Sequence, residues 1–266
     1  MATKFIRPFV KIHGGKRYLY KWVIQNFPKD YKKYCETHCG ACSVFLNKLP
    51  SDYECINDVD PKLISIINAI RNKLPRFQAE LKQLDYCEQT FKDALNRSTR
   101  FVNSIDAAVN EFTIRRMSRG GLKKAFAWSD RQRGGMPGDV NAWNTIIEHL
   151  PMIAQRLKQA LVYNQPAINF IKENDSPETF FYCDPPYLHE TRRSTKTYEF
   201  EMSKDDHIEL AQTLNACKGK VMISGYDSKL YQELYINWNR EEHRVANHSS
   251  QTKIKQYKTE CIWKNY

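Results

Sequence analysis

The order of apolar and polar side chains in the first third of the chain predicts alternating helices and strands. Apolar residues recur at three- and four-residue steps over residues 17–27, which is the spacing of one helix face. Residues 31–37 and 53–58 have the pattern of short strands. A second helix is predicted to begin at Asp60, because aspartate can cap a helix and Pro61 has its φ already fixed.

The pattern changes in the middle of the chain and then returns. Residues 62–161 are mostly helical in pattern and rich in charge, with no convincing strand. Strands are predicted again over residues 179–183, 220–224 and 260–264, and a helix is predicted to begin after Ser203. Strands separated by helices predict an α/β fold in which a sheet has helices on both faces.

The length of the chain, 266 residues, suits one large domain or one domain that carries an insertion. The helical middle interrupts the α/β pattern. We therefore expect residues 1–61 and 162–266 to form one discontinuous domain, with residues 62–161 as a helical insertion.

Positive charge is in excess and is concentrated in one segment. Lys and Arg total 41 against 30 Asp and Glu, a formal net charge of +11. Residues 115–133 alone contain seven basic residues and one acidic residue, a net charge of +6. Such a surface attracts a polyanion. The charge alone is equally compatible with a soluble basic protein that has no nucleic-acid partner.

The eight cysteines do not have the context of a secreted, disulfide-bonded protein. No secretory signal opens the chain, and no apolar run approaches the roughly 18 residues needed to cross a bilayer. We therefore expect reduced cysteines, a cytoplasmic location and no membrane partner.

A dense set of soft ligands provides a competing interpretation of one segment. Cys35, His38, Cys39 and Cys42 are the ligand types that zinc takes. No second ligand pair follows at zinc-finger spacing. The side chains at 35 and 39 also diverge if a strand turns into a helix there. We therefore expect no metal. The alternative, which belongs to a different functional class, is a non-enzymatic nucleic-acid-binding module with a Cys/His metal site.

The four residues Asp184, Pro185, Pro186 and Tyr187 carry the most chemical information. They follow a predicted buried strand, where an open α/β sheet places its ligand crevice. An exocyclic amino nitrogen of a base is a poor nucleophile, because its lone pair is delocalised into the ring. The Asp184 carboxylate and the Pro185 carbonyl can accept hydrogen bonds from its two protons, and Tyr187 can stack on the base. The alternative is a plain turn that ends a strand.

Several short motifs follow one another along nearly the whole chain. They are Lys11 with Gly14-Gly15-Lys16, residues 36–45, 57–60, 116–121, 126–129 and 133–143, Asp184–Tyr187, and residues 225–228 and 260–263. In this order they resemble the Dam-type (alpha-group) DNA adenine methyltransferases of bacteria and phages. The resemblance implies a Rossmann-like S-adenosylmethionine-dependent methyltransferase domain, interrupted by a mainly helical target-recognition domain. It also implies methyl transfer to the exocyclic amino group of adenine.

The resemblance assigns cofactor contacts to several residues of this chain. Lys11, Gly14, Gly15 and Lys16 would line the pocket near the methionine end of S-adenosylmethionine. Asp58 would accept hydrogen bonds from both ribose hydroxyls. Asp184 would contact both the cofactor amine and the target base.

One motif departs from the pattern of the family. The family usually has proline, an aromatic residue and consecutive glycines where this chain has residues 37–42, and only Gly40 remains of the glycine run. His38 stands at the place of the aromatic ring. We expect Glu36, His38 and Gly40 to be cofactor contacts.

The basic segment is expected to contact double-stranded DNA. Arginines interleaved with aromatic residues and paired glycines suit phosphate contacts and readout of base edges. The candidate DNA-binding residues are Arg115, Arg116, Arg119, Lys123, Lys124, Trp128, Arg131 and Arg133. Since the target amino group lies inside the duplex, the base must rotate out.

Two narrower alternatives remain open: a methyltransferase that acts on RNA, and one that acts on a cytosine amino group. A cognate restriction endonuclease is a possible partner of the predicted enzyme, and a monomer is expected.

Overall fold

The computed structural model describes residues 5–97, 104–192, 199–246 and 257–266. The chain divides into two compact units. The first comprises residues 1–20, 39–49 and 60–164, and the second comprises residues 21–38, 50–59 and 165–266. The predicted insertion, residues 62–161, lies within the first unit, which also holds residues 1–20 and 39–49 of the predicted α/β domain and a few residues on either side of the insertion. The functional boundaries therefore stay a prediction.

The second unit is built on strands that lie in the order β2-β1-β6-β7-β9-β8. They are β1 (Lys33–Glu36), β2 (Tyr53–Asn57), β6 (Thr179–Cys183), β7 (Lys220–Tyr226), β8 (Asn239–Ala246) and β9 (Tyr257–Lys264). The first four strands in this order are parallel, while β9 is antiparallel to both β7 and β8. Every residue of β6 is buried, as expected for a parallel strand that is covered on both faces.

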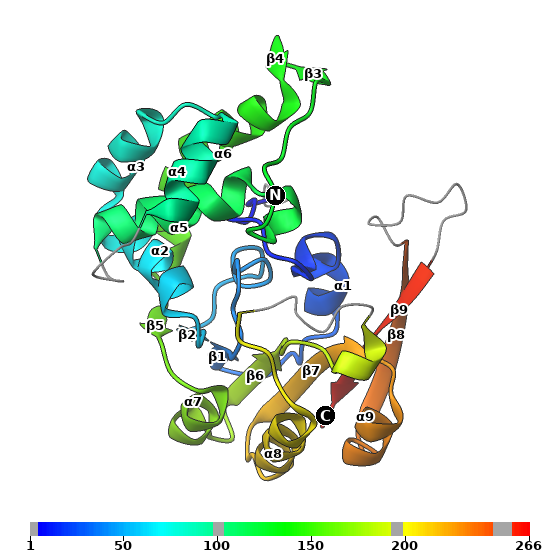
Figure 1. The fold of residues 1–266 in the computed structure, drawn as a ribbon. Coiled ribbons are helices and arrows are strands. Elements are labelled where there is room, and N and C mark those ends of the chain that lie inside the picture. The colour runs from blue at the N-terminus through cyan, green and yellow to red at the C-terminus, as the bar shows by residue number, and fades with distance from the viewer. Residues whose placement is uncertain (1–4, 98–103, 193–198, 247–256) are drawn as a thin grey trace. The chain divides into compact units, whose positions relative to one another are not determined.

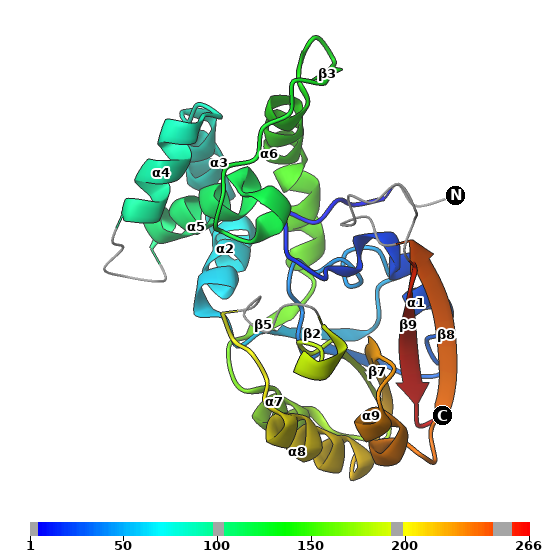
Figure 2. The same cartoon turned by 45° about the vertical axis from the view of Figure 1, so that its right-hand side comes forward.

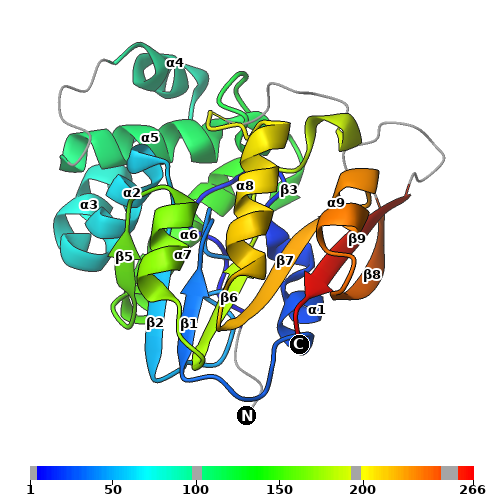
Figure 3. The same ribbon diagram turned by 90° about the horizontal axis from the view of Figure 1, so that it is seen from below.

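Helices cover both faces of this sheet, as the sequence predicts. The helices of the second unit are α1 (Tyr20–Gln25), α7 (Ala167–Asn174), α8 (Lys204–Asn215) and α9 (Lys229–Leu234), with a 3-10 turn, η3 (His189–Thr191). Figures 1 and 3 show α7, α8 and α9 along one face and α1 on the other. The predicted start of α8 is confirmed, because Ser203 and Asp206 form a capping box.

Aromatic rings form the core beneath α1. The ring of Phe27, just after this helix, meets the ring of Phe180 on β6 at a centroid distance of 4.7 Å, edge to face. Tyr34 on β1 packs against both rings. Burying each ring stabilises the fold by roughly 1.5–3 kcal/mol. This core fixes β1 against β6.

The sequence pattern does not predict β8. Its described side chains are mostly charged or polar and exposed, because β8 is an edge strand and half of its backbone groups face solvent. It pairs with β9 from Asn239 opposite Lys264 to Ala246 opposite Tyr257, and Figure 2 shows the two strands side by side. β9 is correspondingly longer than the predicted residues 260–264.

The first unit is mostly helical, as predicted for the middle of the chain. It contains α2 (Pro61–Asn72), α3 (Leu74–Lys82), α4 (Glu88–Asn96), α5 (Ile105–Met117), α6 (Gly138–Leu157), η1 (Lys16–Tyr18), η2 (Arg119–Gly121) and β5 (Leu161–Tyr163). The predicted start of α2 is confirmed, because Asp60 accepts hydrogen bonds from the backbone N–H groups of Lys62 and Leu63. Nothing in the described part of the chain forms a helix with the length and apolar character of a membrane span.

The prediction that the middle contains no strand is wrong at one place. A short hairpin joins β3 (Gln132–Arg133) to β4 (Met136–Pro137), at the tip of the first unit in Figure 1. Gly134 and Gly135 form its turn with φ values of 60° and 77°. Two consecutive left-handed residues are typical of a type I′ hairpin turn, which glycine adopts without strain. The sequence pattern does not predict these two strands, because two residues are too few to show the alternation of apolar and polar side chains that indicates a strand.

Candidate active site and nucleic-acid interface

Three carboxylates follow the carboxyl ends of parallel strands in the second unit. Glu36 ends β1, Asp58 follows β2, and Asp184 follows β6. β1 has β2 on one side and β6 on the other. The order in which the chain adds strands to the sheet therefore changes direction at β1, while the strands stay parallel. The crevice outside such a switch point is where open α/β sheets bind ligands.

The buried side-chain amide of Asn57, the last residue of β2, links the end of β2 to the end of β1. Its Nδ2 donates to the carbonyls of Thr37 and Gln165 at 3.0 Å each. Its Oδ1 accepts from the Gln165 backbone N–H at 3.1 Å. The backbone next to Asp58 is therefore fixed by three hydrogen bonds. Asn57 falls in the motif of residues 57–60 but has no predicted role there, although a polar residue at the end of a buried strand is a usable signal.

The carboxylate of Asp184 is held by a neighbouring strand. The hydroxyl of Ser224 on β7 donates to Asp184 Oδ1 at 2.7 Å, and Ser224 is completely buried. The carbonyl of Cys183 and the hydroxyl of Tyr182 lie at 3.3 and 3.4 Å from the same Ser224 oxygen. Asp184 is only half-buried, so it is oriented by the protein without being sealed inside it.

Tyr187 is fixed at both its hydroxyl and its ring. Its hydroxyl donates to Glu260 Oε2 at 2.6 Å, and its ring lies 4.6 Å from that of Tyr226, edge to face. Burial, then the charges of Glu260 and Asp184, raise the pKa of Tyr187 well above its usual value, so the phenol stays protonated. Pro185 is buried and Pro186 half-buried. The structure thus brings together the four residues predicted to be catalytic with two that sequence reasoning missed, Ser224 and the role of Glu260.

Glu36 and His38, predicted cofactor contacts, lie at the end of β1. Glu36 is buried and accepts a hydrogen bond of 2.7 Å from the hydroxyl of Tyr34. His38 Nδ1 lies 2.8 Å from the hydroxyl of Thr37. Burial, with a smaller contribution from His207, lowers the pKa of His38 to about 4. The imidazole is therefore neutral at neutral pH.

The amino-terminal motif lies in the first unit. Lys11 Nζ is 3.7 Å from Asp139 on α6, and burial, then the charge of Arg116, lowers the pKa of Lys11 to about 8. Gly121 packs so closely here that a side chain on it would meet the Lys11 carbonyl at 2.2 Å. The backbone of the predicted motif is thus pressed against a glycine of the basic segment.

The remaining residues of that motif differ in exposure. Gly14, in the left-handed region at φ 75°, and Gly15 are exposed. Lys16 is buried, with its Nζ 3.5 Å from the Gly14 carbonyl. The exposed backbone of the two glycines is open to a ligand.

The altered glycine-rich motif has a strained residue. Gly40, another predicted cofactor contact, has φ 49°, and Cys42 has φ 56° although it is not glycine. Cys42 is completely buried. A left-handed conformation costs a residue with a side chain roughly 1–2 kcal/mol. The presence of cysteine instead of glycine at position 42 therefore carries a local energetic cost.

The described residues contain no group of three or more His, Cys, Asp or Glu side chains arranged to hold a metal ion. The competing zinc interpretation therefore receives no support from this part of the chain.

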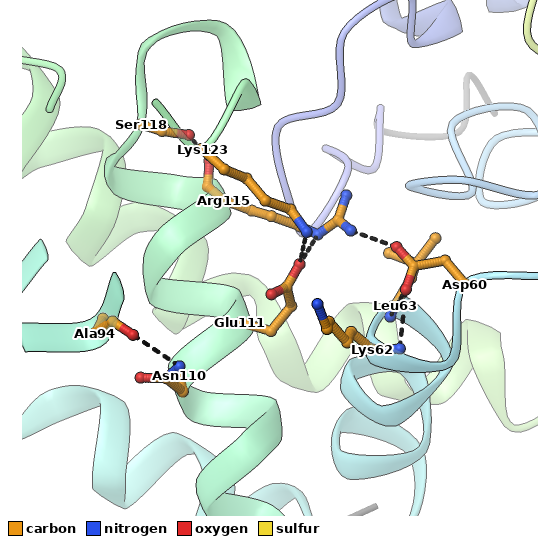
Figure 4. Close-up of polar contacts among 9 residues, drawn as sticks. All are labelled: Asp60, Lys62, Leu63, Ala94, Asn110, Glu111, Arg115, Ser118 and Lys123. Carbon is orange, nitrogen blue, oxygen red and sulfur yellow. Dashed lines mark hydrogen bonds and ion pairs between the residues drawn. The ribbon is translucent and has the colours of Figure 1, made fainter. Parts of the chain in front are cut away.

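Arg115 lies in a buried ion-pair network rather than on the surface. Its guanidinium donates to Asp60 at 2.5 Å and to Glu111 at 2.7 Å, and Lys123 pairs with the same Glu111. Figure 4 shows these side chains converging between α5 and the start of α2. The geometry favours a structural role for Arg115, because both its carboxylate partners and its own side chain are buried.

Arg116 is half-buried and donates to the carbonyl of Ala142 at 3.0 Å. Burial lowers the pKa of Arg116 to about 10, so its charge persists at neutral pH. Of the other predicted DNA-binding residues, Lys123 is half-buried, and five are exposed: Arg119, Lys124, Trp128, Arg131 and Arg133.

Three of the five exposed members, Arg119, Arg131 and Arg133, lie at two structured segments, and Lys124 and Trp128 lie between these segments in the chain. Arg119 begins η2, and its backbone N–H donates to the carbonyl of Ala125 at 2.8 Å. Arg131 and Arg133 lie at the β3–β4 hairpin, which is closed by a hydrogen bond of 2.8 Å from Gly138 N to the Arg131 carbonyl. The Trp128 indole is 47% exposed and donates to Asp130. Cations and an aromatic ring on turns of this kind can contact a nucleic-acid backbone and bases.

Comparison with known proteins identifies the family of the chain. Residues 13–251 match the D12 class of N6 adenine-specific DNA methyltransferases. The chain is 25% identical to the type II methyltransferase M1.LlaDCHI of Lactococcus lactis subsp. cremoris, over 98% of this chain and 96% of the relative. It is 24% identical to the type II methyltransferase M.MjaIII of Methanocaldococcus jannaschii, over 88% and 89%. It is 23% identical to a DNA adenine methylase of Haemophilus influenzae, over 95% and 91%.

The match covers most of the chain and includes the Asp184–Tyr187 loop and the basic segment. It confirms the predicted family, fold class and enzyme class. The chain belongs to the D12 class of N6 adenine-specific DNA methyltransferases.

Proposed function

We propose that this enzyme transfers the methyl group of S-adenosylmethionine to the N6 amino nitrogen of an adenine that has rotated out of duplex DNA. The observation that supports this most strongly is the orientation of Asp184 by Ser224 at the carboxyl end of β6. A carboxylate held in one direction at this edge can accept a hydrogen bond from the amino group of a base.

The adenine amino group must become a better nucleophile before it reacts. The Asp184 carboxylate and the Pro185 carbonyl accept hydrogen bonds from its two protons, which favours a pyramidal nitrogen with a localised lone pair. As the bond from N6 to the methyl carbon forms, the bond from that carbon to sulfur would break and leave its electron pair on sulfur. One amino proton would then pass to solvent, while the Asp184 carboxylate and the Pro185 carbonyl hold the nitrogen in place. The rate gain comes from positioning and fixed dipoles.

The carboxylates of the second unit fit the hydrogen-bond donors of S-adenosylmethionine. The Asp58 side chain follows a strand whose end is fixed by Asn57, which suits bidentate contact with ribose hydroxyls. Asp184 is proposed to contact the cofactor ammonium as well, and Glu36 and His38 to line the same pocket. Gly40 lies in the first unit, and its assignment as a cofactor contact rests on the sequence motif. When bound, S-adenosylmethionine supplies an electrophilic methyl group on a positively charged sulfur. For Lys11, Gly14, Gly15 and Lys16 the assignment to the methionine end rests on the sequence motif.

Tyr187 is proposed to stack on the extrahelical base. A stacking partner contributes most when its own position is fixed, because little side-chain entropy is then lost on binding. The hydrogen bond to Glu260 and the contact with Tyr226 provide this fixation.

DNA is proposed to lie against the exposed basic residues of the first unit. Arg119, Lys124, Arg131 and Arg133 supply phosphate contacts, and Trp128 an aromatic surface. Arg116 and Lys123 are half-buried and are proposed to contribute to the local positive field. We leave Arg115 out of the contact set, because its charge is already compensated inside the protein. In this proposal residues 62–161 recognise the target sequence.

Two of the relatives are named type II methyltransferases. Their names support a setting in which methylation protects DNA from a cognate endonuclease. Digestion of host DNA by such an endonuclease, with and without this gene expressed, tests that setting.

The base specificity is tested by incubating the enzyme with S-adenosylmethionine and unmethylated duplex DNA, then separating the nucleosides of the product. N6-methyladenine is expected. N4-methylcytosine, or methylation of RNA in preference to duplex DNA, would contradict the proposal. The same assay with the Asp184→Asn variant is a control for contaminating activity.

A further inference from the structure

Two of the cysteines in the altered glycine-rich motif, Cys39 and Cys42, form the two ends of a single tight turn. The backbone N–H of Cys42 donates to the Cys39 carbonyl at 2.7 Å, which closes a β-turn over residues 39–42. The φ angle is positive at Gly40 and not at Ala41, as in a type II′ turn with glycine at its first central position. The turn has the sequence Cys-Gly-Ala-Cys, which is the C-x-x-C pattern of redox-active dithiols.

The two thiols of this turn are directed at the same backbone oxygen. The sulfur of Cys39 and the sulfur of Cys42 each donate to the carbonyl of Gly40 at 3.9 Å, which is the weak kind of hydrogen bond that a thiol makes. Both cysteines are in the thiol form in this structure. Because the two S–H groups share one acceptor, both side chains lie on the same side of the turn.

The spacing of the two cysteines suits a disulfide. The Cα atoms of the first and last residues of a β-turn lie within roughly 7 Å of each other. A disulfide joins cysteines whose Cα atoms are roughly 4.4–6.8 Å apart. Rotation about the two Cα–Cβ bonds can therefore bring the sulfurs of Cys39 and Cys42 together with little movement of the backbone.

The backbone of Cys42 has a conformation that suits glycine better than cysteine. Its φ of 56° lies in the left-handed region, and its side chain is completely buried. Strained residues persist where the surrounding structure fixes them, and they cluster at functional sites. The strain tells against a passive cysteine at this position, and the thiol of Cys39 gives Cys42 a partner for chemistry.

We propose that Cys39 and Cys42 are a redox modification site, at which hydrogen peroxide converts the two thiols into a disulfide and thereby weakens the binding of S-adenosylmethionine. One sulfur attacks a peroxide oxygen, the O–O bond breaks, and a sulfenic acid and one water form. The second sulfur then attacks the first, so that an S–S bond forms and a second water leaves. The two cysteines together lose two electrons and two protons, which reduce the peroxide to water.

The burial of the pair determines which oxidant can reach it. Cys39 is 4% exposed and Cys42 is completely buried, so a large disulfide-bonded oxidant cannot approach either sulfur in the folded protein. Hydrogen peroxide is small and uncharged, and it needs to reach only one of the two sulfurs, because the second step is internal to the turn.

The disulfide would act on the motif through the Gly40 carbonyl. In the reduced turn this oxygen accepts from both thiols, and a disulfide has no S–H group, so both donors are lost together. Gly40 is the residue that remains of the glycine run in the proposed cofactor motif. A change in the direction of its carbonyl therefore changes backbone that is proposed to approach the cofactor. This effect on affinity rests on the proposed cofactor role of Gly40, whereas formation of the disulfide does not.

Formation of the disulfide is tested by peptide mapping of the full-length protein after treatment with hydrogen peroxide. Thiols that remain are alkylated, and cleavage after Glu36 separates Cys35 from the pair. We expect the peptide that holds Cys39 and Cys42 to lose both thiol hydrogens and to regain them with dithiothreitol. Cys35 and Cys55 lie opposite each other in the register of β1 and β2 and are the competing pair. A link between those two in place of the proposed one, or no link, would overturn the proposal.

The effect on the cofactor is measured by equilibrium binding of S-adenosylmethionine to the reduced and oxidised protein. We expect the oxidised protein to bind roughly 10-fold more weakly, and reduction to restore the affinity. The affinity of Cys39→Ser and Cys42→Ser should not respond to peroxide, because serine cannot form the link. Cys217→Ser is a matched control that should respond as the wild-type protein does, because this half-buried cysteine lies after α8.

A peroxide response that persists in Cys39→Ser would contradict the proposal, and so would a mapped disulfide that leaves the affinity unchanged. If the serine variants do not fold, the mapping and the reversible loss of affinity in the wild-type protein decide. Failure of the proposed function is recognised separately, because it would appear in the methylated nucleosides that the fully reduced enzyme produces.

Discussion

The hydroxyl of Tyr187 donates a hydrogen bond of 2.6 Å to the carboxylate of Glu260, and both side chains are buried. Glu260 on β9 lies opposite Tyr226 on β7, whose ring contacts Tyr187. The carboxylate and the ring together fix the proposed stacking residue.

Replacing Glu260 with Gln should therefore slow methyl transfer without unfolding the protein. The amide retains an acceptor for the Tyr187 hydroxyl but loses the charge that strengthens the bond. We expect kcat to fall about 10-fold and the affinity for S-adenosylmethionine to change little. Steady-state kinetics of Glu260→Gln, Tyr187→Phe and the double variant measure the coupling. Additive losses in this cycle would show that the two side chains act independently.

Ser224→Ala should release Asp184 from its fixed direction. The variant removes one buried hydroxyl and one hydrogen bond to a carboxylate, so we expect a rate loss of roughly 10-fold or more in single-turnover assays. Ser228→Ala is a matched control, because Ser228 caps α9 through Tyr231 N. The control should lose about 1 kcal/mol of stability and keep its rate of methyl transfer. Equal rates in the two variants would contradict the role given to Ser224.

Arginines of the basic segment should divide into two classes. Arg133→Gln, at the exposed hairpin, is expected to weaken DNA binding and to reduce the slope of log K against log salt by about 1, with little change in stability. Arg115→Met is expected to cost about 3–5 kcal/mol, because it leaves Asp60 and Glu111 buried with less compensation. Salt titrations and urea unfolding of the two variants check this division. A salt slope unchanged in Arg133→Gln would remove the hairpin from the DNA surface.

Stability should decrease in mild acid through His207. Its pKa in the folded protein is about 4, below its ordinary value of 6.5, chiefly because it is buried. Between these two values the unfolded chain binds the proton and the folded chain does not, so stability is full above pH 6.5 and is lost as the pH falls toward 4. His207→Gln should flatten this dependence by up to about 1 kcal/mol per pH unit. Urea unfolding at pH 7, 6 and 5 measures it, and parallel curves for the two proteins would refute it.

The elements that could be predicted from the sequence are those with a local signal. The strand Thr179–Cys183 is observed with its predicted bounds, because a continuous apolar run is ended by Asp184 and two prolines. The caps at Asp60 and Ser203 are equally local. β8 has no such signal, because an exposed edge strand needs no alternation of apolar residues.

Long-range partners explain the rest of the candidate site. Arg115 has the sequence context of a surface cation, and only its contact with Asp60, 55 residues away, shows that it is buried. Ser224 and Asp184 are 40 residues apart, and Tyr187 and Glu260 are 73 apart. A motif identifies which residues react. The register of the sheet determines which side chains hold them.

The most direct test of the account is the single-turnover rate of an Asp184→Ala protein on duplex DNA with saturating S-adenosylmethionine. Folding is verified by its unfolding curve and DNA binding by titration. If Asp184 orients the adenine amino group, the rate should fall by about 10³-fold or more while the fold and DNA affinity are retained. A rate within a few-fold of the wild-type value would contradict the central claim.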